Sequence, residues 1–321
     1  MNKGSNTNVL GSLSLWRLRE RPYVLLTFAT LFWAGSIVLG RGVIDTIPPI
    51  SLAFWRWSGA LILLLPFAWQ HVRRDWPTAV QHWKMLALLA LLGISCFNTL
   101  LYIAVQTTTA INGALVQSAM PAVIIVLSLL LFREKIAAVQ SLGVSMCIAG
   151  AAMVVMRGSW HTLIQLSPVQ GDVWMLVAVV LYALYSVLLR KRPAMHPLSF
   201  LALTCGIGVL SLAPLYLWEL SWIRPTATAS NITLSVMYLA VFPSVLAYLC
   251  WNRGIELIGA NRGGLFINLI PVFASLLAIA MLSESLHGFH VIGMGLIFSG
   301  MVLFNRRAAH TLAPERGNKR S

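Results

Sequence analysis

The chain has 321 residues, of which 58% are hydrophobic and 10% are charged, and its formal net charge is +14. Soluble domains contain about 25% charged residues, and no water-soluble fold can bury this much apolar surface, so we expect lipid to surround most of the chain. The positive charges lie at the ends of apolar runs and not along one polar face, which argues against nucleic acid as a partner.

Ten apolar runs are each long enough to cross a hydrocarbon core of about 30 Å as a helix. The runs are continuous and not alternating, which favours helices over the strands of a membrane barrel. The connections between them leave no room for a soluble domain. The runs are Pro22–Arg41, Pro49–Trp69, Lys84–Val105, Thr109–Phe132, Ile136–Met156, Gly171–Leu189, Pro197–Trp218, Ile232–Trp251, Ala260–Leu282 and Leu286–Phe304.

Lysine and arginine residues indicate the orientation, because cytoplasmic loops are enriched in them. If the N-terminus lies in the cytoplasm, the external side holds Arg41, Arg157 and Arg224, and Arg56 lies within a run. All the other lysines and arginines then fall in cytoplasmic tails and loops. Both termini are therefore expected in the cytoplasm, with an even number of spans between them.

The stretch from Asn98 to Gly150 recurs about 150 positions later, which indicates an internal duplication. A unit of five spans repeated in tandem enters the membrane from opposite sides, so the two repeats are inverted. Inverted repeats are typical of secondary transporters, whose substrate site lies between the halves near the bilayer midplane. The matched pairs include Ala110 with Ala260, Gly113 with Gly263, Pro121 with Pro271, Glu134 with Glu284, Gly143 with Gly293 and Gly150 with Gly300.

These patterns predict an all-α polytopic membrane protein. Its ten transmembrane helices form two inverted five-helix repeats, and the N- and C-termini are cytoplasmic. The predicted parts are a cytoplasmic N-terminal tail (1–21), the first repeat (22–156), an external linker (157–170), the second, inverted repeat (171–305) and a basic cytoplasmic C-terminal tail (306–321).

The sequence resembles the drug/metabolite transporter superfamily, in its EamA-type ten-helix branch, over nearly the whole chain. The motifs that carry the resemblance are Phe132-Arg133-Glu134 with Gly143 and Gly150, and Leu282-Ser283-Glu284 with Gly293 and Gly300; Pro121, Pro271 and Arg56 fit as well. The length and the many tryptophans are most similar to the aromatic amino-acid exporters of that branch. The resemblance implies a multi-pass exporter of a bacterial cytoplasmic (inner) membrane, and we expect a monomer.

Polar residues recur at matched positions of the third and eighth spans. A buried amide or phenol in lipid is costly unless it faces a partner or a cavity. Residues four apart share a helix face, so these side chains either join helices or form a cavity wall that hydrogen-bonds a zwitterion. The candidates are Ser95, Asn98 and Tyr102 in the third span, and Ser244, Tyr248 and Asn252 in the eighth.

The fourth and ninth spans place polar residues just before a proline. Gln117 and Ser118 precede Pro121, and Asn268 precedes Pro271. A proline inside a helix removes one amide donor and frees a carbonyl, and such a carbonyl is tolerated in a membrane where it is buried in protein or faces water. The prolines are therefore expected either to shape the bundle by a simple kink or to open a cavity and permit gating.

Aromatic residues are a further set of cavity candidates. Most of the 12 tryptophans are expected in interfacial belts. Trp33 and Tyr182 lie well inside their spans and match under the repeat, so they either line a cavity or pack in the bundle. The same two alternatives apply to Trp251.

Arg56 lies within the second span, where it either extends to the outer interface or faces the cavity. No aspartate or glutamate lies in the middle of any run, which argues against proton-coupled export of lipophilic cations. A phosphate-bearing substrate would need lysine or arginine in the cavity, and Arg56 is the one candidate. We therefore expect a neutral cavity with aromatic walls and scattered polar groups, which suits a zwitterion.

The expected function is export of amino acids, aromatic and other neutral or zwitterionic ones, by alternating access through a central cavity and without proton coupling. The alternatives are export of another small metabolite or drug, a nucleotide-sugar or sugar-phosphate carrier, and a channel or scaffolding membrane protein. No GxSxG, HExxH or Walker A motif is present, so no enzymatic activity is expected. We expect no cofactor and no metal, because the four cysteines lie inside apolar runs without CxxC spacing.

Overall fold

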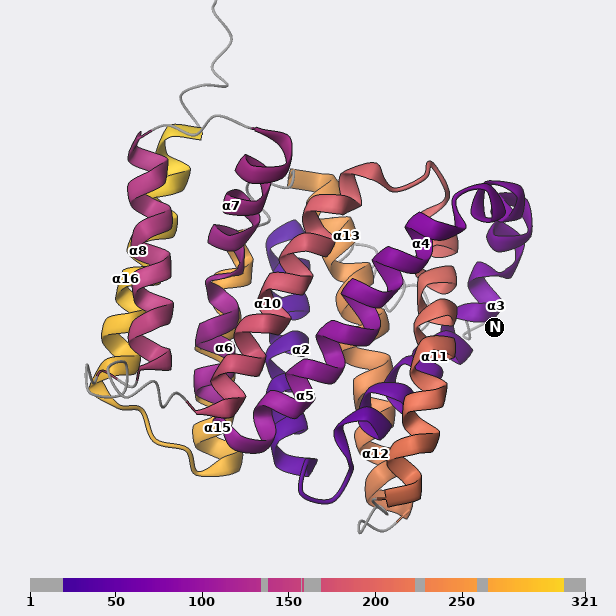
Figure 1. Ribbon diagram of the computed structural model, residues 1–321, viewed down its shortest axis with the longest axis horizontal. Coiled ribbons are helices and arrows are strands. Elements are labelled where there is room, and N and C mark those ends of the chain that lie inside the picture. Colours follow the sequence, from indigo (N-terminus) through magenta and orange to yellow (C-terminus); the bar gives the residue numbers. More distant parts are fainter. Residues whose placement is uncertain are drawn as a thin grey trace, which may run out of the picture.

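The computed structural model describes residues 20–133, 138–156, 158, 169–222, 229–258 and 265–308. All regular secondary structure in these residues is helical, and the helices pack side by side into a bundle (Figure 1). The elements are α2 (Pro22–Val43), α3 (Pro49–Gln81), α4 (Trp83–Ala90), η1 (Leu91–Cys96), α5 (Phe97–Thr107), α6 (Ala110–Ser118), α7 (Met120–Phe132), α8 (Ala138–Val155), α10 (Gln170–Leu188), η2 (Leu189–Lys191), α11 (Pro197–Trp222), α12 (Ala229–Leu239), η3 (Ala240–Leu246), α13 (Ala247–Ile258), η4 (Leu265–Asn268), α15 (Leu269–Leu282) and α16 (Gly288–Ala308).

Several of these elements join into longer segments that are apolar enough to cross a membrane. Seven segments are both long enough and apolar enough to cross a membrane, and there are three shorter apolar helices. The prediction of an all-α protein with apolar spanning helices is therefore confirmed for the described residues. The seven are Pro22–Val43, Pro49–Gln81, Trp83–Thr107, Ala110–Phe132, Gln170–Lys191, Pro197–Trp222 and Thr233–Trp251, and the shorter ones are Ser141–Val155, Phe266–Leu282 and Gly288–Leu303.

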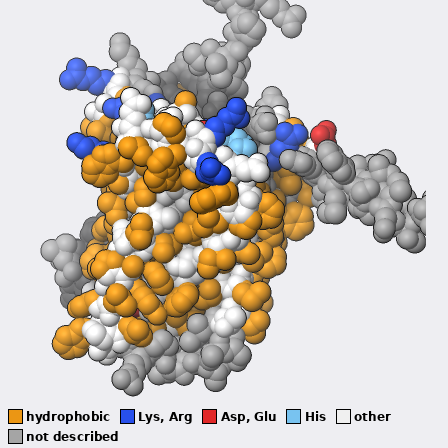
Figure 2. Space-filling model, turned by 90° about the vertical axis from the view of Figure 1, so that its right-hand side faces the viewer, with side chains coloured by type: hydrophobic (Ala, Val, Ile, Leu, Met, Phe, Trp, Pro, Cys, Tyr) orange, Lys and Arg blue, Asp and Glu red, His pale blue; other side chains and the backbone are white. Residues whose placement is uncertain are grey.

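The outer surface of the bundle is apolar, as expected for contact with lipid. Figure 2 shows hydrophobic side chains over most of one face, with lysine and arginine gathered at one end of it. Phe67 on α3 and Leu210 on α11 are each 74% exposed. A soluble protein rarely leaves so large an apolar surface uncovered, so the face is suited to hydrocarbon. Most of the predicted tails and linker lies outside the described residues.

Helix α3 is longer than the apolar run that predicts it. The run ends at Trp69, whereas the helix continues to Gln81 through Pro66 and Pro77. Arg73 and Arg74 in this extension are exposed. Hydropathy marks where a helix leaves the hydrocarbon and not where the helix itself ends, which explains the difference.

Local backbone features recur in the two halves at the spacing of the sequence repeat. A π-helical segment interrupts both the third and the eighth predicted spans, as η1 and η3. Arg133 and Ser283, which follow α7 and α15, both have left-handed backbone conformations, with φ of 53° and 55°. The π-helical turn is rare and frequently marks a functional site, so its occurrence in both halves directs attention to the space between them.

Helices α8 and α16 form a separate pair at one side of the bundle (Figure 1). Their glycines let the two backbones come close: a Cβ on Gly150 would lie 2.6 Å from the carbonyl oxygen of Gly293, and one on Gly300 would lie 2.4 Å from that of Gly143. In lipid, no hydrophobic force draws helices together, and small residues at an interface allow the close van der Waals packing that holds them. This pair is therefore a packing element.

Carboxylates cap helix N-termini across the bundle. Glu219 on α11 is 3% exposed and accepts hydrogen bonds from the backbone N–H groups of Ile50 and Ser51 at 3.0 and 2.6 Å, and from Ser51 Oγ at 2.7 Å. At the opposite end of the same helix pair, Asp75 on α3 accepts from the N–H of His196, just before α11, at 2.8 Å. These reciprocal caps, which satisfy N–H groups that have no partner inside their own helix, show that α3 and α11 are antiparallel.

Glu284, in the motif Leu282-Ser283-Glu284, also caps a helix N-terminus. Its two carboxylate oxygens accept from the N–H groups of Ala110 and Ile111, the first residues of α6, at 2.8 and 3.1 Å. The contact joins the second half of the chain to the first. Glu134, its counterpart under the repeat, lies outside the described residues.

Candidate functional site

A cavity of about 310 Å³ lies in the middle of the bundle and is walled by both halves of the chain. Helices α8 and α16 do not contribute to it, whereas each of the other segments described above as apolar spans or shorter apolar helices does. Its lining residues are Trp33, Ser36, Ile37, Arg56, Trp57, Gly93, Phe97, Asn98, Leu101, Ala114, Gln117, Ser118, Met120, Ile124, Tyr182, Tyr185, Ser186, Leu189, Arg192, Pro197, Phe200, Leu201, Tyr248, Trp251, Ile267 and Ile270.

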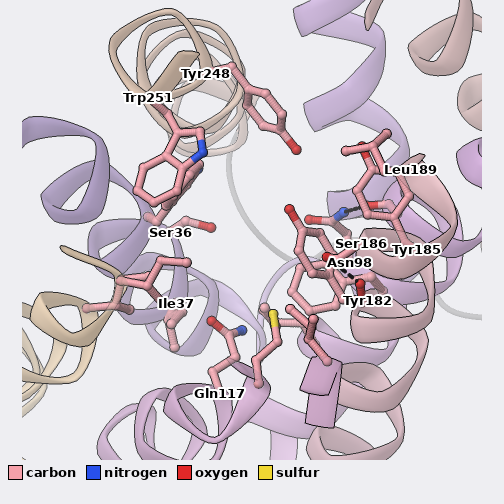
Figure 3. Close-up of a pocket in the computed structure, with 18 of the residues that line it drawn as sticks. Ser36, Ile37, Asn98, Gln117, Tyr182, Tyr185, Ser186, Leu189, Tyr248 and Trp251 are labelled. Atoms are coloured by element: carbon pink, nitrogen blue, oxygen red, sulfur yellow. Dashed lines mark hydrogen bonds between the residues drawn. The ribbon is translucent and has the colours of Figure 1, made fainter. Parts of the chain in front are cut away.

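Aromatic side chains form much of the wall. Trp33 on α2 lies against Tyr248 and Trp251 on α13, with ring centroids 6.0 and 5.1 Å apart. On the facing wall, Tyr182 on α10 lies 4.5 Å from Phe97 on α5. Figure 3 shows Trp251, Ser36 and Ile37 on one side of the space and Asn98, Tyr182 and Ser186 on the other. Such a space suits an apolar or aromatic substrate body.

The π-helical segments position two of these wall residues. Asn98 donates through Nδ2 to the carbonyl of Ile94 in η1 at 2.8 Å. Trp33 donates through Nε1 to the carbonyl of Pro243 in η3 at 3.1 Å. Both acceptors lie in a π-helical segment, whose wider turn redirects carbonyl groups toward side chains. The bond of Trp33 also joins the two halves of the chain.

Arg56 is the basic residue of the cavity interior. It is 5% exposed, and it donates through Nε to Ser244 Oγ at 2.9 Å and through Nη1 to Ser36 Oγ at 3.2 Å and to the Tyr102 hydroxyl at 2.9 Å. The alternative that Arg56 extends to the outer interface is therefore wrong, because hydroxyl groups from three other helices hold the guanidinium inside the bundle. The expectation of a neutral cavity is wrong for the same reason.

Most of the residues predicted for the cavity lie on its wall. Gln117 and Ser118 come from the end of α6, and Figure 3 shows the amide of Gln117 at the base of the space. The predicted residues that the structure places on the wall are Trp33, Asn98, Gln117, Ser118, Tyr182, Tyr248 and Trp251.

Four other predicted residues are buried away from the wall. Ser95 bonds to Ser211 Oγ at 2.6 Å and joins η1 to α11. Tyr102 and Ser244 are fully buried and hold Arg56. Asn268 is 8% exposed and lies just before α15. The side chain of Asn252, the remaining candidate, lies outside the described part of the chain.

The two prolines begin new helical segments instead of interrupting a continuous helix. The fourth span breaks at Ala119, and Pro121 is the second residue of α7. In the ninth, the short η4 ends at Asn268 and Pro271 lies in the first turn of α15. Proline is tolerated in a first turn because its missing N–H would have no partner there. The breaks place Gln117, Ser118 and Ile267 beside the cavity.

The lining also includes residues that the sequence did not single out. Ser36 lies one turn after Trp33 on α2, and Ser186 lies one turn after Tyr182 on α10, so each continues a face that was already a candidate. Trp57 and Arg192 do not lie one helical turn from a residue that was predicted for the cavity. Trp57 adjoins Arg56 on α3, and Arg192 follows η2.

The cavity opens toward the end of the bundle that holds Arg192, which we call the inner end. Arg192 is exposed, and the lining continues from it through Leu189 and Pro197. At the opposite, outer end, no residue between Gly40 and Pro49 is part of the wall, and Ile44 and Ile47 there are buried. The structure is therefore open at one end only among the described residues.

Polar contacts hold the outer end closed. Arg41 on α2 donates to the carbonyls of Val105 and Gln106 at 3.0 and 3.1 Å. Asp172 at the start of α10 is fully buried and accepts from the hydroxyl of Thr108. These bonds join α2, α5 and α10, so the closure involves both halves of the chain.

Asn112 extends this closure to the last helix. Its Nδ2 lies 3.4 Å from both oxygens of Asp172, and its Oδ1 lies 2.8 Å from Nε2 of His290 on α16. Because Nδ1 of His290 accepts from the N–H of His287 at 3.0 Å, the proton is assigned to Nε2, which donates to Asn112. The chain of bonds ties α6, α10 and α16 together.

Comparisons with known proteins identify the family. Residues 21–156 and 169–306 each match the EamA-like transporter family. The uncharacterized transporter YyaM of Bacillus subtilis is 28% identical over 87% of this chain and 92% of its own length. An uncharacterized transporter of Archaeoglobus fulgidus is 27% identical over 89% of this chain and 98% of its own length.

A solved crystal structure has the same fold, with a TM-score of 0.60, 19% identity, and coverage of 89% of this chain and 98% of the other. The two family matches cover each half of the chain, as the internal duplication requires. The protein therefore belongs to the EamA-like transporter family of the drug/metabolite transporter superfamily.

Proposed function

We propose that this protein exports amino acids, aromatic and other neutral or zwitterionic ones, across the cytoplasmic membrane. The observation that carries the proposal is the cavity of about 310 Å³, walled by aromatic residues of both halves. This volume is at the small end of the range for ligand pockets, about 300–1,000 Å³, and suits one amino acid. The resemblance of the sequence to the aromatic amino-acid exporters of the EamA-type branch supports an aromatic substrate.

The mechanism we propose is alternating access. Ten helices cross the membrane as two inverted repeats, both termini are cytoplasmic, and the inner end faces the cytoplasm, where the substrate enters. Rocking of the repeats then breaks the outer contacts that Asp172 and Glu284 make with the first repeat and opens the cavity outward. The protein works as a monomer, because both walls of the cavity come from one chain.

Flux is proposed to follow the gradient of the substrate itself. The sequence has no aspartate or glutamate in the middle of an apolar run. The carboxylates of Glu219 and Glu284 are engaged in capping helix N-termini. A proton-coupled exporter would need a carboxyl group that both substrate and proton can reach.

Counterflow in proteoliposomes tests the proposal. Vesicles that contain the purified protein are preloaded with one unlabelled amino acid, and uptake of the labelled form is followed with and without a pH gradient. Internal phenylalanine or tryptophan is expected to stimulate uptake severalfold over protein-free liposomes, equally under both conditions. Failure of every amino acid to stimulate uptake would refute the substrate class, and a signal that needs the gradient would refute uncoupled transport.

A further inference from the structure

We propose that the cavity recognises its substrate through a carboxylate bound by Arg56, and that the amino group of the substrate is not required. The substrate class is then organic monocarboxylates with an apolar or aromatic body, which includes hydroxy acids as well as amino acids. The inference rests on the proposed function insofar as it takes the central cavity as the transport site.

The hydrogen bonds of Arg56 leave part of its guanidinium available. An arginine side chain offers one N–H at Nε and two at each Nη. Nε bonds to Ser244, and Nη1 bonds to Ser36 and Tyr102. Nη2 has no hydrogen-bond partner in the described part of the chain, and Arg56 lines the cavity. The three hydroxyl groups thus fix the orientation of the guanidinium while two N–H donors remain free.

The charge of Arg56 is not balanced by a protein carboxylate. Its partners are neutral hydroxyls and the ring of Trp57, and the carboxylates of the described side chains lie elsewhere. Asp172 lies at the outer closure, Asp75, Glu219 and Glu284 cap helix N-termini, and Glu20 and Asp45 are exposed. A buried cation without a counter-ion is costly in a membrane protein. A substrate anion in the cavity would supply that counter-ion, so the site favours a negatively charged group.

Two further donors on residues that line the cavity lack partners. Nε2 of Gln117 and Nε1 of Trp57 are buried, and neither has a hydrogen-bond partner in the structure as described. Both residues line the cavity with Arg56. Unpaired buried donors are rare because they lose their bonds to water. A carboxylate accepts at both oxygens and donates nothing, so it satisfies donors of this kind.

The number of charges favours one carboxylate over a phosphate. Arg56 is the single cation of the cavity interior among the described residues, since Arg192 lies exposed at the mouth. One guanidinium balances one carboxylate, whereas a phosphate dianion would keep an uncompensated charge in the bundle. Charge-assisted bonds from arginine to a carboxylate are stronger than neutral hydrogen bonds, so this contact is expected to dominate recognition.

An ammonium group finds no comparable partner. Besides Arg56, the cavity wall offers the oxygen of Asn98, tyrosine hydroxyls and aromatic faces. These groups accept a cation weakly compared with a carboxylate. Replacing the amino group of a substrate by a hydroxyl is therefore expected to change affinity little, whereas replacing the carboxylate by an amide should reduce it strongly.

The test compares three ligands with one aromatic body on the full-length protein in nanodiscs and proteoliposomes. Phenylalanine carries both charges, phenyllactate carries the carboxylate alone, and phenylalaninamide carries the ammonium alone. Binding is measured as ligand-dependent thermal stabilisation and transport as inhibition of phenylalanine counterflow. Phenylalanine and phenyllactate are expected to act at similar concentrations, and the amide is expected to be weaker by roughly tenfold to a hundredfold.

The matching variants are Arg56→Gln and Gln117→Leu, with Arg74→Gln as the control because Arg74 is exposed on the extension of α3. Arg56→Gln should remove the preference for the carboxylate over the amide. Gln117→Leu removes a donor that has no protein partner, so it should leave the fold intact and weaken both acids severalfold. It keeps the test decisive if Arg56→Gln does not fold.

The outcomes separate the inference from the proposed function. Equal potency of the amide and the two acids in the wild type would overturn the inference and leave amino-acid export standing. Binding of phenyllactate without transport of any amino acid would refute amino-acid export and support the carboxylate site. Absence of binding by all three ligands would overturn both.

Discussion

Glu219→Ala is expected to reduce the free energy of unfolding by about 3 kcal/mol or more, because it leaves buried donors without an acceptor. The carboxylate of Glu219 receives three hydrogen bonds from the first turn of α3, and it is 3% exposed. Its negative charge also interacts with the positive end of the α3 dipole. Alanine removes both effects.

The measurement is the midpoint of thermal unfolding in detergent, followed by the fraction of protein that remains monodisperse after heating. Glu219→Gln keeps one acceptor oxygen and should lie between alanine and the wild type. Glu20→Ala is the control, because Glu20 is exposed and its contact with Arg253 spans 3.7 Å. A midpoint for Glu219→Ala equal to that of Glu20→Ala would contradict the capping role.

Ser186→Trp is expected to lower transport at least about tenfold, equivalent to ~1.4 kcal/mol, while the protein remains folded. Ser186 lies half-buried on the cavity wall, and its hydroxyl bonds to the carbonyl of Tyr182 on its own helix at 2.8 Å. The substitution therefore breaks no side-chain hydrogen bond between helices among the described residues. An indole ring, which covers about 150–250 Å² in a packed site, would take up much of the space for a substrate.

Counterflow of the substrate that the wild type carries measures this effect, with folded protein quantified by size-exclusion chromatography. Ser221→Trp is the matched control, since Ser221 is exposed near the end of α11. The control should transport at the wild-type rate. Wild-type transport by Ser186→Trp would mean that substrate does not pass through this cavity.

The fold followed from the sequence to a large extent, because hydrocarbon imposes a simple rule on the chain. Each span must be apolar and about 20 residues long, and a duplicated unit keeps its glycines and prolines in register. The repeat relates Gly143 to Gly293 and Gly150 to Gly300, and the same four glycines form the close contacts between α8 and α16, Gly150 with Gly293 and Gly143 with Gly300. Neither hydropathy nor the repeat indicates where a helix ends once it has left the hydrocarbon, as α3 does before its end at Gln81.

The cavity wall was predictable in part. Asn98 and Tyr102 share a helix face by spacing, but Asn98 lines the cavity whereas Tyr102 bonds to Arg56. Spacing defines a face and does not say which neighbouring helix covers each point on it. The π-helical turn of η1 also shifts the face of Ser95 relative to that of Asn98, and hydropathy gives no sign of this turn.

The sequence left the position of Arg56 open between the outer interface and the cavity. Hydropathy showed a cation near the end of a run, where extension to the interface is the usual solution. The structure instead surrounds it with hydroxyls from positions 36, 102 and 244, which come from three different helices. Such a set depends on tertiary contacts between residues far apart in the sequence, so no local pattern could predict it.

Substrate protection of one cavity residue tests the central claim, that the space between the two repeats is the substrate site. In a variant with Cys96 and Cys250 replaced by alanine, Ser186→Cys is labelled with a membrane-impermeant maleimide in inside-out vesicles, which present the cytoplasmic side, where the proposed topology places the inner end. Ala194→Cys, which is exposed between η2 and α11, is the control. Saturating substrate is expected to slow labelling severalfold at Ser186→Cys and to leave Ala194→Cys unchanged. Equal labelling of Ser186→Cys with and without substrate, in a variant that still transports, would contradict the claim.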